Sequence, residues 1–283
     1  MSQHCVSHVQ EKAENVSQTC RVLSISRSGF YAAKCRAKRS TPCAITPRLK
    51  ARFTESGRSY GSRRLAVALK QDGVQIGRCR VRRLMRESGL RSTWRRKFVS
   101  TTNSRHGLAV AENILNRQFN PVAQNTAWVS DITYIRSRTG WLYLAVVLDL
   151  YSRKVVGWAM DRSMPAELVC RALALAIGQR NPAPGLVIHS DRGSQYASAE
   201  YQALLERSDL VCSMSRTGNC WDNAVAERFF LSLKMERVWQ RDYANQGEAT
   251  RDIHDYIVNF YNERRLNSQL GYTSPNSFER QAA

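Results

Sequence analysis

From residue 126 onward, the hydrophobic positions follow strand spacing and then alternate between helix spacing and strand spacing. Residues 126–135 are rich in β-formers, and residues 141–160 hold two apolar runs separated by a turn, which predicts a hairpin next to the first strand. The later segments are a helix at 165–180, a strand at 186–188, a helix at 198–209, a strand at 211–215 and a helix at 222–238. This order predicts an α/β fold, a mixed sheet flanked by helices.

The first part of the chain shows helix spacing only. Residues 16–36 read as a helix, a Ser-rich turn and a second helix, which is typical of the end of a helix-turn-helix unit. Three further short helices are expected at 47–57, 60–73 and 76–89, because each segment closes on a glycine that suits a helix C-terminus. This pattern predicts an all-α, helix-turn-helix-like region before the sheet.

The helix expected at 76–89 is amphipathic and rich in arginine. Its hydrophobic side chains, Val81, Leu84 and Met85, can pack inward. An exposed basic helix in a small helical domain can contact phosphates or base edges of DNA, although a solvated helix surface explains the same pattern. The candidate DNA contacts are Arg78, Arg82, Arg83 and Arg86 on this helix, and Arg95, Arg96 and Lys97 in the extended basic linker that follows.

The net charge of +20 is concentrated in the first part of the chain. Residues 1–121 carry 25 basic and 6 acidic side chains, a net charge of +19, whereas residues 122–283 carry 18 and 17, a net charge of +1. Such a local excess favours a polyanion-binding surface over a merely solvated one, and DNA is the expected partner. The expected domains are an N-terminal helical segment at 1–40, a basic helix-turn-helix-like domain with its linker at 41–121, and a sheet domain with a C-terminal helix at 122–283.

The expected compartment is the cytoplasm. No segment approaches the roughly 18 apolar residues of a transmembrane helix, and the residues after Met1 have no apolar signal core. The 8 cysteines occur without a CxxC pair, which indicates thiols in a reducing compartment. No membrane partner is therefore expected, and the protein should be found with the DNA of the cell when it binds DNA.

Two acidic residues occupy positions suited to one shared site. Asp191 follows the strand expected at 186–188, at the end where open α/β sheets place their ligands. Glu227 lies at the edge of the buried stripe of the helix at 222–238, and Lys234, seven positions later, lies on the same edge. The stripe is formed by Ala226, Phe229, Phe230 and Leu233, with Asp222 or Asn223 expected at the N-cap.

A third acid, Asp131, interrupts one face of the first expected strand. Three carboxylates in one cleft would raise each other's pKa values unless divalent cations neutralise them, and oxygen-only ligands select Mg²⁺ or Mn²⁺ rather than Zn²⁺. The candidate catalytic residues and metal ligands are therefore Asp131, Asp191 and Glu227.

Other polar residues near these acids have structural explanations. Asp149, inside the hairpin, suits a turn-forming or capping role. His189 suits a sheet position with satisfied hydrogen bonds, and Gly193 suits a backbone position with positive φ. None of them is expected to be catalytic on its own.

Three motifs in order carry a resemblance to a known family. The segments WVSDITYI, HSDRGSQY and GNCWDNAVAERFFLSLKMER, with a lysine seven residues after the glutamate, resemble the DDE signature of bacterial insertion-sequence transposases, specifically the OrfB-type proteins of insertion sequence family three. These proteins are similar to retroviral integrases, so the resemblance implies an RNase H-like fold. It extends from about Val16 to the C-terminal YNERRLNSQLGYTSP, and departs at Asn267, where many relatives carry a histidine.

The resemblance implies a DNA transposase in which the three acids hold two Mg²⁺ ions. A phosphodiester at an insertion-element end would be cleaved, and the freed 3'-OH would attack target DNA by transesterification, which integrates the element. Lys234 would contact a phosphate of the DNA end. The resemblance also implies a homo-multimer that pairs two ends, and an upstream helix-turn-helix partner or frameshifted fusion.

Two alternatives stay open at this point. A metal-dependent nuclease without strand transfer would use the same carboxylates, and a strand-transfer assay separates the two. A non-catalytic DNA-binding regulator would keep the basic region and lose the chemistry. The presence of all three acids and Lys234 argues against such decay.

Overall fold

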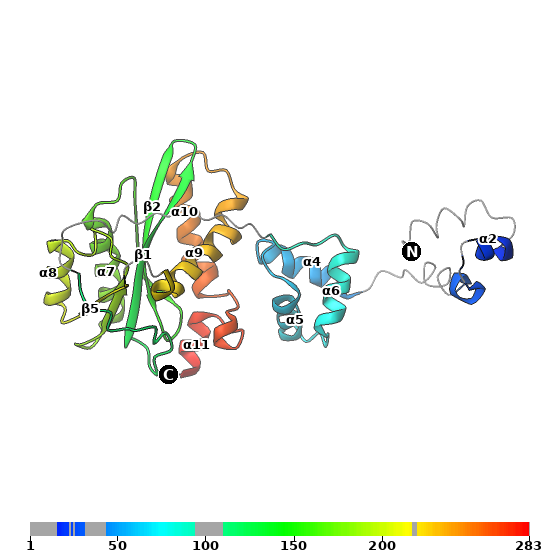
Figure 1. Ribbon diagram of the computed structural model, residues 1–283, viewed down its shortest axis with the longest axis horizontal. Coiled ribbons are helices and arrows are strands. Elements are labelled where there is room, and N and C mark those ends of the chain that lie inside the picture. Colours follow the sequence, from blue (N-terminus) through cyan, green and yellow to red (C-terminus); the bar gives the residue numbers. More distant parts are fainter. Residues whose placement is uncertain are drawn as a thin grey trace. The chain divides into compact units, whose positions relative to one another are not determined.

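The computed structural model describes residues 16–22, 24, 26–31, 44–93, 110–216 and 220–282 (Figure 1). The chain divides into two compact units, residues 1–50 and 51–283. Near the N-terminus, α2 spans Val16–Val22 and residues 27–31 are also helical, as expected for the described part of that segment. Three of the candidate DNA contacts, Arg95, Arg96 and Lys97, lie outside the described residues.

The three short helices of the basic region are present. They are α4 (Ile45–Glu55), α5 (Ser62–Gln71) and α6 (Arg78–Glu87). Each is followed by a glycine with positive φ, at +62° for Gly57, +78° for Gly73 and +66° for Gly89, which confirms the helix ends expected from the sequence. In α6, the hydrophobic residues Val81, Leu84 and Met85 are buried and the arginines between them are exposed.

The sheet has five strands in the order β3-β2-β1-β4-β5, which confirms the predicted α/β class. β1 pairs antiparallel with β2 and parallel with β4, so the sheet is mixed. The hairpin strands are long because each is rich in residues that suit a pleated, buried surface. The bounds are β1 Ala127–Ser137, β2 Gly140–Asp149, β3 Val155–Asp161, β4 Val187–Ser190 and β5 Val211–Met214.

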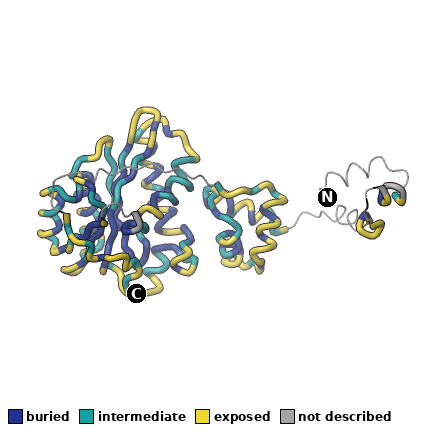
Figure 2. The backbone as a smooth tube through the Cα atoms, viewed as in Figure 1, coloured by how far each residue is buried: buried dark blue, intermediate teal, exposed yellow. Residues whose placement is uncertain are grey.

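Helices cover both faces of the sheet (Figure 1). One group is α7 (Ala166–Arg180) and α8 (Ala199–Arg207), and the other is α9 (Ala224–Glu236), α10 (Gln246–Asp255) with the π-helix η3 (Tyr256–Asn262), and α11 (Pro275–Ala282). Short 3-10 helices are η1 (Cys220–Asn223), η2 (Val238–Gln240) and η4 (Ser268–Leu270). Buried backbone follows the sheet and the inner helix faces, as the dark segments of Figure 2 show.

Close packing of α7 on the sheet depends on a glycine. A Cβ at Gly157 in β3 would clash with the carbonyl oxygen of Ala172, so only glycine allows this approach. The last long helical segment also contributes to the core, since Ile253 and Ile257 are fully buried and Phe260 and Tyr261 nearly so. That segment ends at Asn262, whose amide exchanges two hydrogen bonds with the backbone of Val155 at 3.0 and 2.9 Å.

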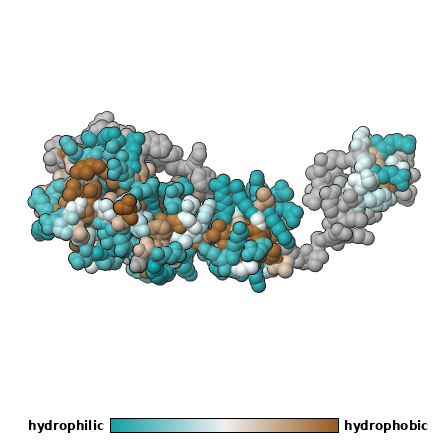
Figure 3. Space-filling view, turned by 90° about the horizontal axis from the view of Figure 1, so that it is seen from below, coloured by the Kyte–Doolittle hydropathy of each residue, from teal (hydrophilic) through white to brown (hydrophobic). Residues whose placement is uncertain are grey.

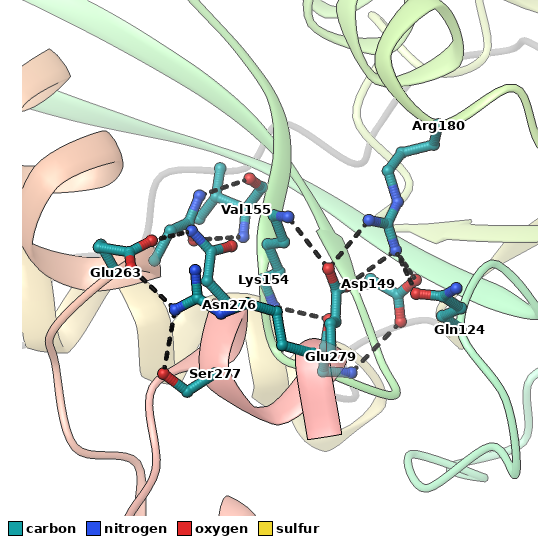
Figure 4. A network of polar contacts seen from close by, with 12 residues as sticks. Gln124, Asp149, Lys154, Val155, Arg180, Glu263, Asn276, Ser277 and Glu279 are labelled. Atoms are coloured by element: carbon teal, nitrogen blue, oxygen red, sulfur yellow. Dashed lines mark hydrogen bonds and ion pairs between the residues drawn. The ribbon is translucent and has the colours of Figure 1, made fainter. Parts of the chain in front are cut away.

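The C-terminal helix is fixed to the sheet by buried polar contacts (Figure 4). Glu279 of α11 accepts hydrogen bonds from Arg180 at 2.8 and 3.0 Å and from Lys154 at 3.0 Å. Arg180 also lies 3.6 Å from Asp149, which accepts the N–H of Tyr151 at 2.7 Å. Asp149 therefore organises the β2–β3 turn, as the sequence predicted.

The surface mixes hydrophilic and hydrophobic atoms, with brown patches on the face seen in Figure 3. Among the described residues, no helix is long and apolar enough to span a membrane. The cysteines whose side chains are described are free thiols, namely Cys20, Cys79, Cys170 and Cys212.

Candidate active site

Asp131 and Asp191 occupy matching positions on two neighbouring parallel strands. β1 and β4 are in register at Val129 and His189. The residues two positions further along are Asp131, within β1, and Asp191, just after the end of β4. Because side chains alternate with period two and paired strands lie about 4.8 Å apart, these carboxylates are neighbours on one face. They lie at the carboxyl edge of the parallel pair, where α/β sheets place ligands.

Glu227 comes from α9, which packs against β1. The predicted stripe of α9 is confirmed, because Ala226, Phe229, Phe230 and Leu233 are all buried. Glu227 lies beside this stripe with its side chain exposed. Two turns later, the Lys234 amine lies 4.7 Å from the centroid of the Tyr134 ring, a cation–π contact that the sequence did not suggest.

The electrostatics centre on Asp131. Burial, followed by the charges of Asp191 and Glu227, raises the pKa of Asp131 well above its usual value. Desolvation also raises the pKa of Glu227. The charge of Lys234 lowers the pKa of Asp131 and so opposes this shift, and burial lowers the pKa of Lys234 itself. The three acids and the lysine therefore influence one another in one region.

The donor set of this region suits a divalent cation. Carboxylate oxygens are the ligands that Mg²⁺ and Mn²⁺ prefer, and the mutual rise in pKa is the effect that such a cation would relieve. In the part of the chain that the structure describes, no three His, Cys, Asp or Glu side chains are arranged closely enough to hold a metal ion. The chemistry of the residues fits the metal, whereas the side-chain arrangement does not form its site.

The residues around Asp191 have mainly structural contacts. His189 is fully buried, its two ring nitrogens pair with Ser213 at 2.9 Å and Ser215 at 3.1 Å, and burial lowers its pKa to about 4. Gly193 lacks the positive φ that the sequence allowed. Instead its N–H donates to Asp191 Oδ1 at 2.9 Å, and an added Cβ would lie only 3.0 Å from that oxygen. Gly193 therefore permits a close turn around the carboxylate.

The start of α9 follows the prediction in position but not in its side-chain contacts. Asn223 occupies the N-cap position, yet its side chain makes no capping hydrogen bond. Its amide nitrogen instead donates to the carbonyl oxygen of Ser130 at 3.2 Å, directly before Asp131. Asp222 does not cap the helix either, because Arg117 and Arg216 bind its carboxylate. The N-cap position predicted for Asp222 or Asn223 is confirmed at Asn223, but neither side chain caps the helix, because tertiary partners bind both.

The remaining candidate DNA contacts lie on α6. Arg78, Arg82, Arg83 and Arg86 are all exposed. Only Arg83 has a nearby acid, since its Nε lies 3.7 Å from Glu87 in an exposed pair that contributes little energy. Of the described candidates, these four thus present their guanidinium groups to solvent, separately from the three acids.

Comparison with known proteins gives the family. A model described as an HTH-like domain matches residues 43–98, and two models described as integrase core domain match residues 121–220 and 227–282. The transposase InsF for insertion sequence IS3A of Escherichia coli (strain K12) is 40% identical over 270 residues, which is 94% of this chain and 94% of that protein. The chain belongs to the IS3 family of transposases. This IS3-family transposase is thus a DNA transposase and a polynucleotidyl transferase with an RNase H-like integrase core.

The chain is also similar to a second curated protein and, more distantly, to solved structures. The insertion element IS600 uncharacterized 31 kDa protein of Shigella sonnei is 42% identical over 262 residues, 92% of the transposase chain and 96% of that protein. A chain of the simian T-cell lymphotropic virus intasome in complex with PP2A regulatory subunit B56 gamma has a TM-score of 0.47 at 15% identity, covering 75% of this chain and 69% of that one. The HTLV-2 integrase catalytic core domain in complex with magnesium (trimeric form) has a TM-score of 0.44 at 15% identity, covering 56% and 99%.

Proposed function

We propose that this transposase cleaves phosphodiesters at insertion-element ends and joins the freed 3'-OH to target DNA, with Asp131, Asp191 and Glu227 as catalytic acids. The observation that supports this most is the register of β1 and β4, which makes Asp131 and Asp191 neighbours at a ligand-binding edge. The effect of the Glu227 charge on Asp131 adds the third acid from α9. Mg²⁺ or Mn²⁺, two ions when fully loaded, would be held by these residues and would supply an activated water and a counter-charge for the leaving oxygen.

The chain's own residues then have distinct tasks. The three carboxylates would hold the cations that neutralise and position the scissile phosphate on one face of the sheet, and no covalent protein intermediate is required. Lys234 contacts a DNA-end phosphate as a point charge, which demands no bidentate geometry. The four exposed arginines of α6, in a basic domain at 41–121 that precedes the catalytic domain at 122–283, hold the DNA. A homo-multimer would pair two element ends, and a helix-turn-helix partner or fusion would act upstream.

A gel assay with labelled end DNA tests this proposal. Wild-type protein with Mg²⁺ should release a 3'-OH strand and then produce joined products with a target duplex, and Asp131→Asn should give neither. Cleavage without joining would favour the nuclease alternative. Tight DNA binding with no Mg²⁺-dependent cleavage would favour a DNA-binding regulator and reject the proposal.

A further inference from the structure

Asp222, at the start of α9, is a fully buried carboxylate held by two arginines. Arg117 donates from Nε to Oδ1 at 2.8 Å. Arg216 donates from Nε to Oδ2 at 3.1 Å, from Nη2 to Oδ1 at 3.2 Å and from its backbone N–H to Oδ2 at 3.0 Å. Asn113 adds a fourth donor group, its Nδ2, at 2.9 Å from Oδ2. The Asp222 carboxylate thus accepts hydrogen bonds from more donor groups than the neutralisation of its charge requires.

The two arginines are half exposed although their carboxylate is not. The side chain of Arg117 keeps 44% of its accessible surface and that of Arg216 keeps 50%, against 0% for Asp222. A guanidinium has five N–H donors, so each arginine has donors left after binding Asp222. The cluster of Arg117, Asp222 and Arg216 has a net charge of +1, and its surplus positive charge lies at the surface.

Both guanidinium groups are fixed in place before any ligand arrives. The backbone N–H groups of Ile114 and Leu115 donate to Ser213 Oγ of β5 at 3.0 and 3.1 Å, which anchors the segment carrying Arg117. Arg117 itself holds a φ of +62°, a conformation uncommon for a non-glycine residue. Arg216 is fixed by its own backbone bond to Asp222. The forks therefore lose little conformational freedom on binding a ligand.

This cluster adjoins the candidate active site. Ser215, the residue before Arg216, donates its N–H to Ser190 O at 2.9 Å and accepts from Arg192 Nε at 2.6 Å. Ser190 and Arg192 flank Asp191 in the chain. Because β4 and β5 are parallel, their carboxyl ends lie at one edge of the sheet, and the arginines share that edge with the acids.

We propose that Arg117 and Arg216, held on Asp222, form a phosphodiester-binding site that grips the DNA backbone next to the catalytic acids. Arginine forks match two phosphate oxygens, and a prearranged pair spans neighbouring positions of a backbone better than mobile lysines do. The inference deepens the proposed function, since it takes DNA as the substrate, but it does not depend on cleavage. A catalytic domain with a net charge of only +1 needs such a local cation site to hold a polyanion near its acids.

The test is a salt titration of DNA binding by the full chain, in EDTA, with a fluorescein-labelled duplex. The double variant Arg117→Ala/Arg216→Ala should reduce the magnitude of the log–log slope by about 1.8, because each lost phosphate contact removes about 0.9. The matched control is Arg207→Ala/Arg280→Ala, which removes two exposed arginines from α8 and α11 and should leave the slope unchanged. Equal slopes for the two double variants would overturn the proposal.

Conservative variants separate a binding role from a structural one. Arg117→Lys/Arg216→Lys keeps both charges, so its slope should match wild type, while its affinity falls because the forks are gone. If the arginines only neutralised Asp222, this variant would bind DNA as wild type does. If the double alanine variant fails to fold, Arg117→Ala alone, which leaves Arg216 on the carboxylate, should lower the slope by about 0.9. If the wild-type protein did not cleave end DNA, the proposed function would be rejected, but the comparison of DNA-binding slopes would still hold.

Discussion

Two carboxylates near the start of α9, Asp222 and Asp131, have pKa values that are shifted in opposite directions. The hydrogen bonds from Arg216 and Arg117 lower the pKa of Asp222 well below its usual value. Burial and neighbouring acids raise the pKa of Asp131 well above its usual value, although Lys234 opposes the shift. The two residues lie close in the fold, since Asn223, next to Asp222, donates to the backbone next to Asp131.

The contrast indicates what each carboxylate is for. Elsewhere the protein pairs its buried acids with arginine, as in the contacts of Glu236 with Arg265 at 2.7 Å and of Asp252 with Arg237 at 2.7 Å. A buried charge left without such pairing costs stability, and strongly perturbed acids are therefore typical of functional sites. The single cation Lys234 does not offset the charge of the acids around Asp131, which therefore call for a further cation, whereas Asp222 is a permanent anchor for arginines.

The largest effect should come from removing an acid from the site. Asp131→Asn, Asp191→Asn and Glu227→Gln should each reduce cleavage by about a thousandfold or more, on the scale seen when one member of a catalytic set is lost. DNA binding should change little, because each substitution removes charge but almost no volume. Gel assays of cleavage and anisotropy of binding, measured on the same preparations, check both statements. Near-normal cleavage by any one variant would remove that residue from the set.

The next effect concerns stability at Asp222. Asp222→Asn should lower the free energy of unfolding at neutral pH by about 1–3 kcal/mol, because it weakens hydrogen bonds made to a charged group. The folded-state pKa lies below the usual 3.8, so the charge stabilises the fold above that value and ceases to do so as the pH falls through the folded pKa. The difference between wild type and variant, measured by denaturant unfolding, should therefore shrink below about pH 4. A gap that widens in acid would contradict this assignment.

Asp131 should behave in the opposite way. Its folded-state pKa lies above 3.8, so the stability it contributes is present at low pH and is lost as the pH rises through the folded pKa. In EDTA at neutral pH, Asp131→Asn should therefore be more stable than wild type, by about 1.4 kcal/mol for each unit of pKa shift. Mg²⁺ should raise the melting temperature of wild type more than that of the variant. If wild type and Asp131→Asn had the same melting temperature in EDTA at low pH and at neutral pH, the charged form of Asp131 would not destabilise the folded protein.

The sequence predicted one half of this contrast and missed the other. Asp131 and Asp191 could be found because strand periodicity and strand ends are local patterns, whereas the parallel pairing of their two strands is known only from the structure. The Asp222 cluster could not, because Arg117 is 105 positions away and no local pattern links the two. A helix-start motif made Asp222 look like a cap, and tertiary hydrogen bonds overrode that preference.

The fold shows the same division between local and distant causes. Helix ends with glycines and the buried stripe of α9 were predictable, since each depends on residues within a few turns. The contact of Lys234 with Tyr134 was not, because it requires the crossing of α9 over β1 to be known. The hydrogen bonds between Asn262, at the end of the π-helix, and Val155 were likewise not predictable, because the two residues are 107 positions apart in the chain.

The smallest effect is expected from substituting Lys234, the cation whose charge lowers the pKa of Asp131. Lys234→Ala should weaken binding of end DNA by about fivefold, roughly 1 kcal/mol, as expected for a single partly screened phosphate contact. It should also raise the pKa of Asp131 further, so the acid limb of the cleavage–pH profile should move to higher pH. Lys234→Arg keeps the charge and should restore the profile, whereas Lys234→Met keeps the stem over Tyr134 and should not. Because a purely structural stem contact would be retained by methionine, wild-type binding and an unshifted profile in Lys234→Met would reduce Lys234 to a packing residue.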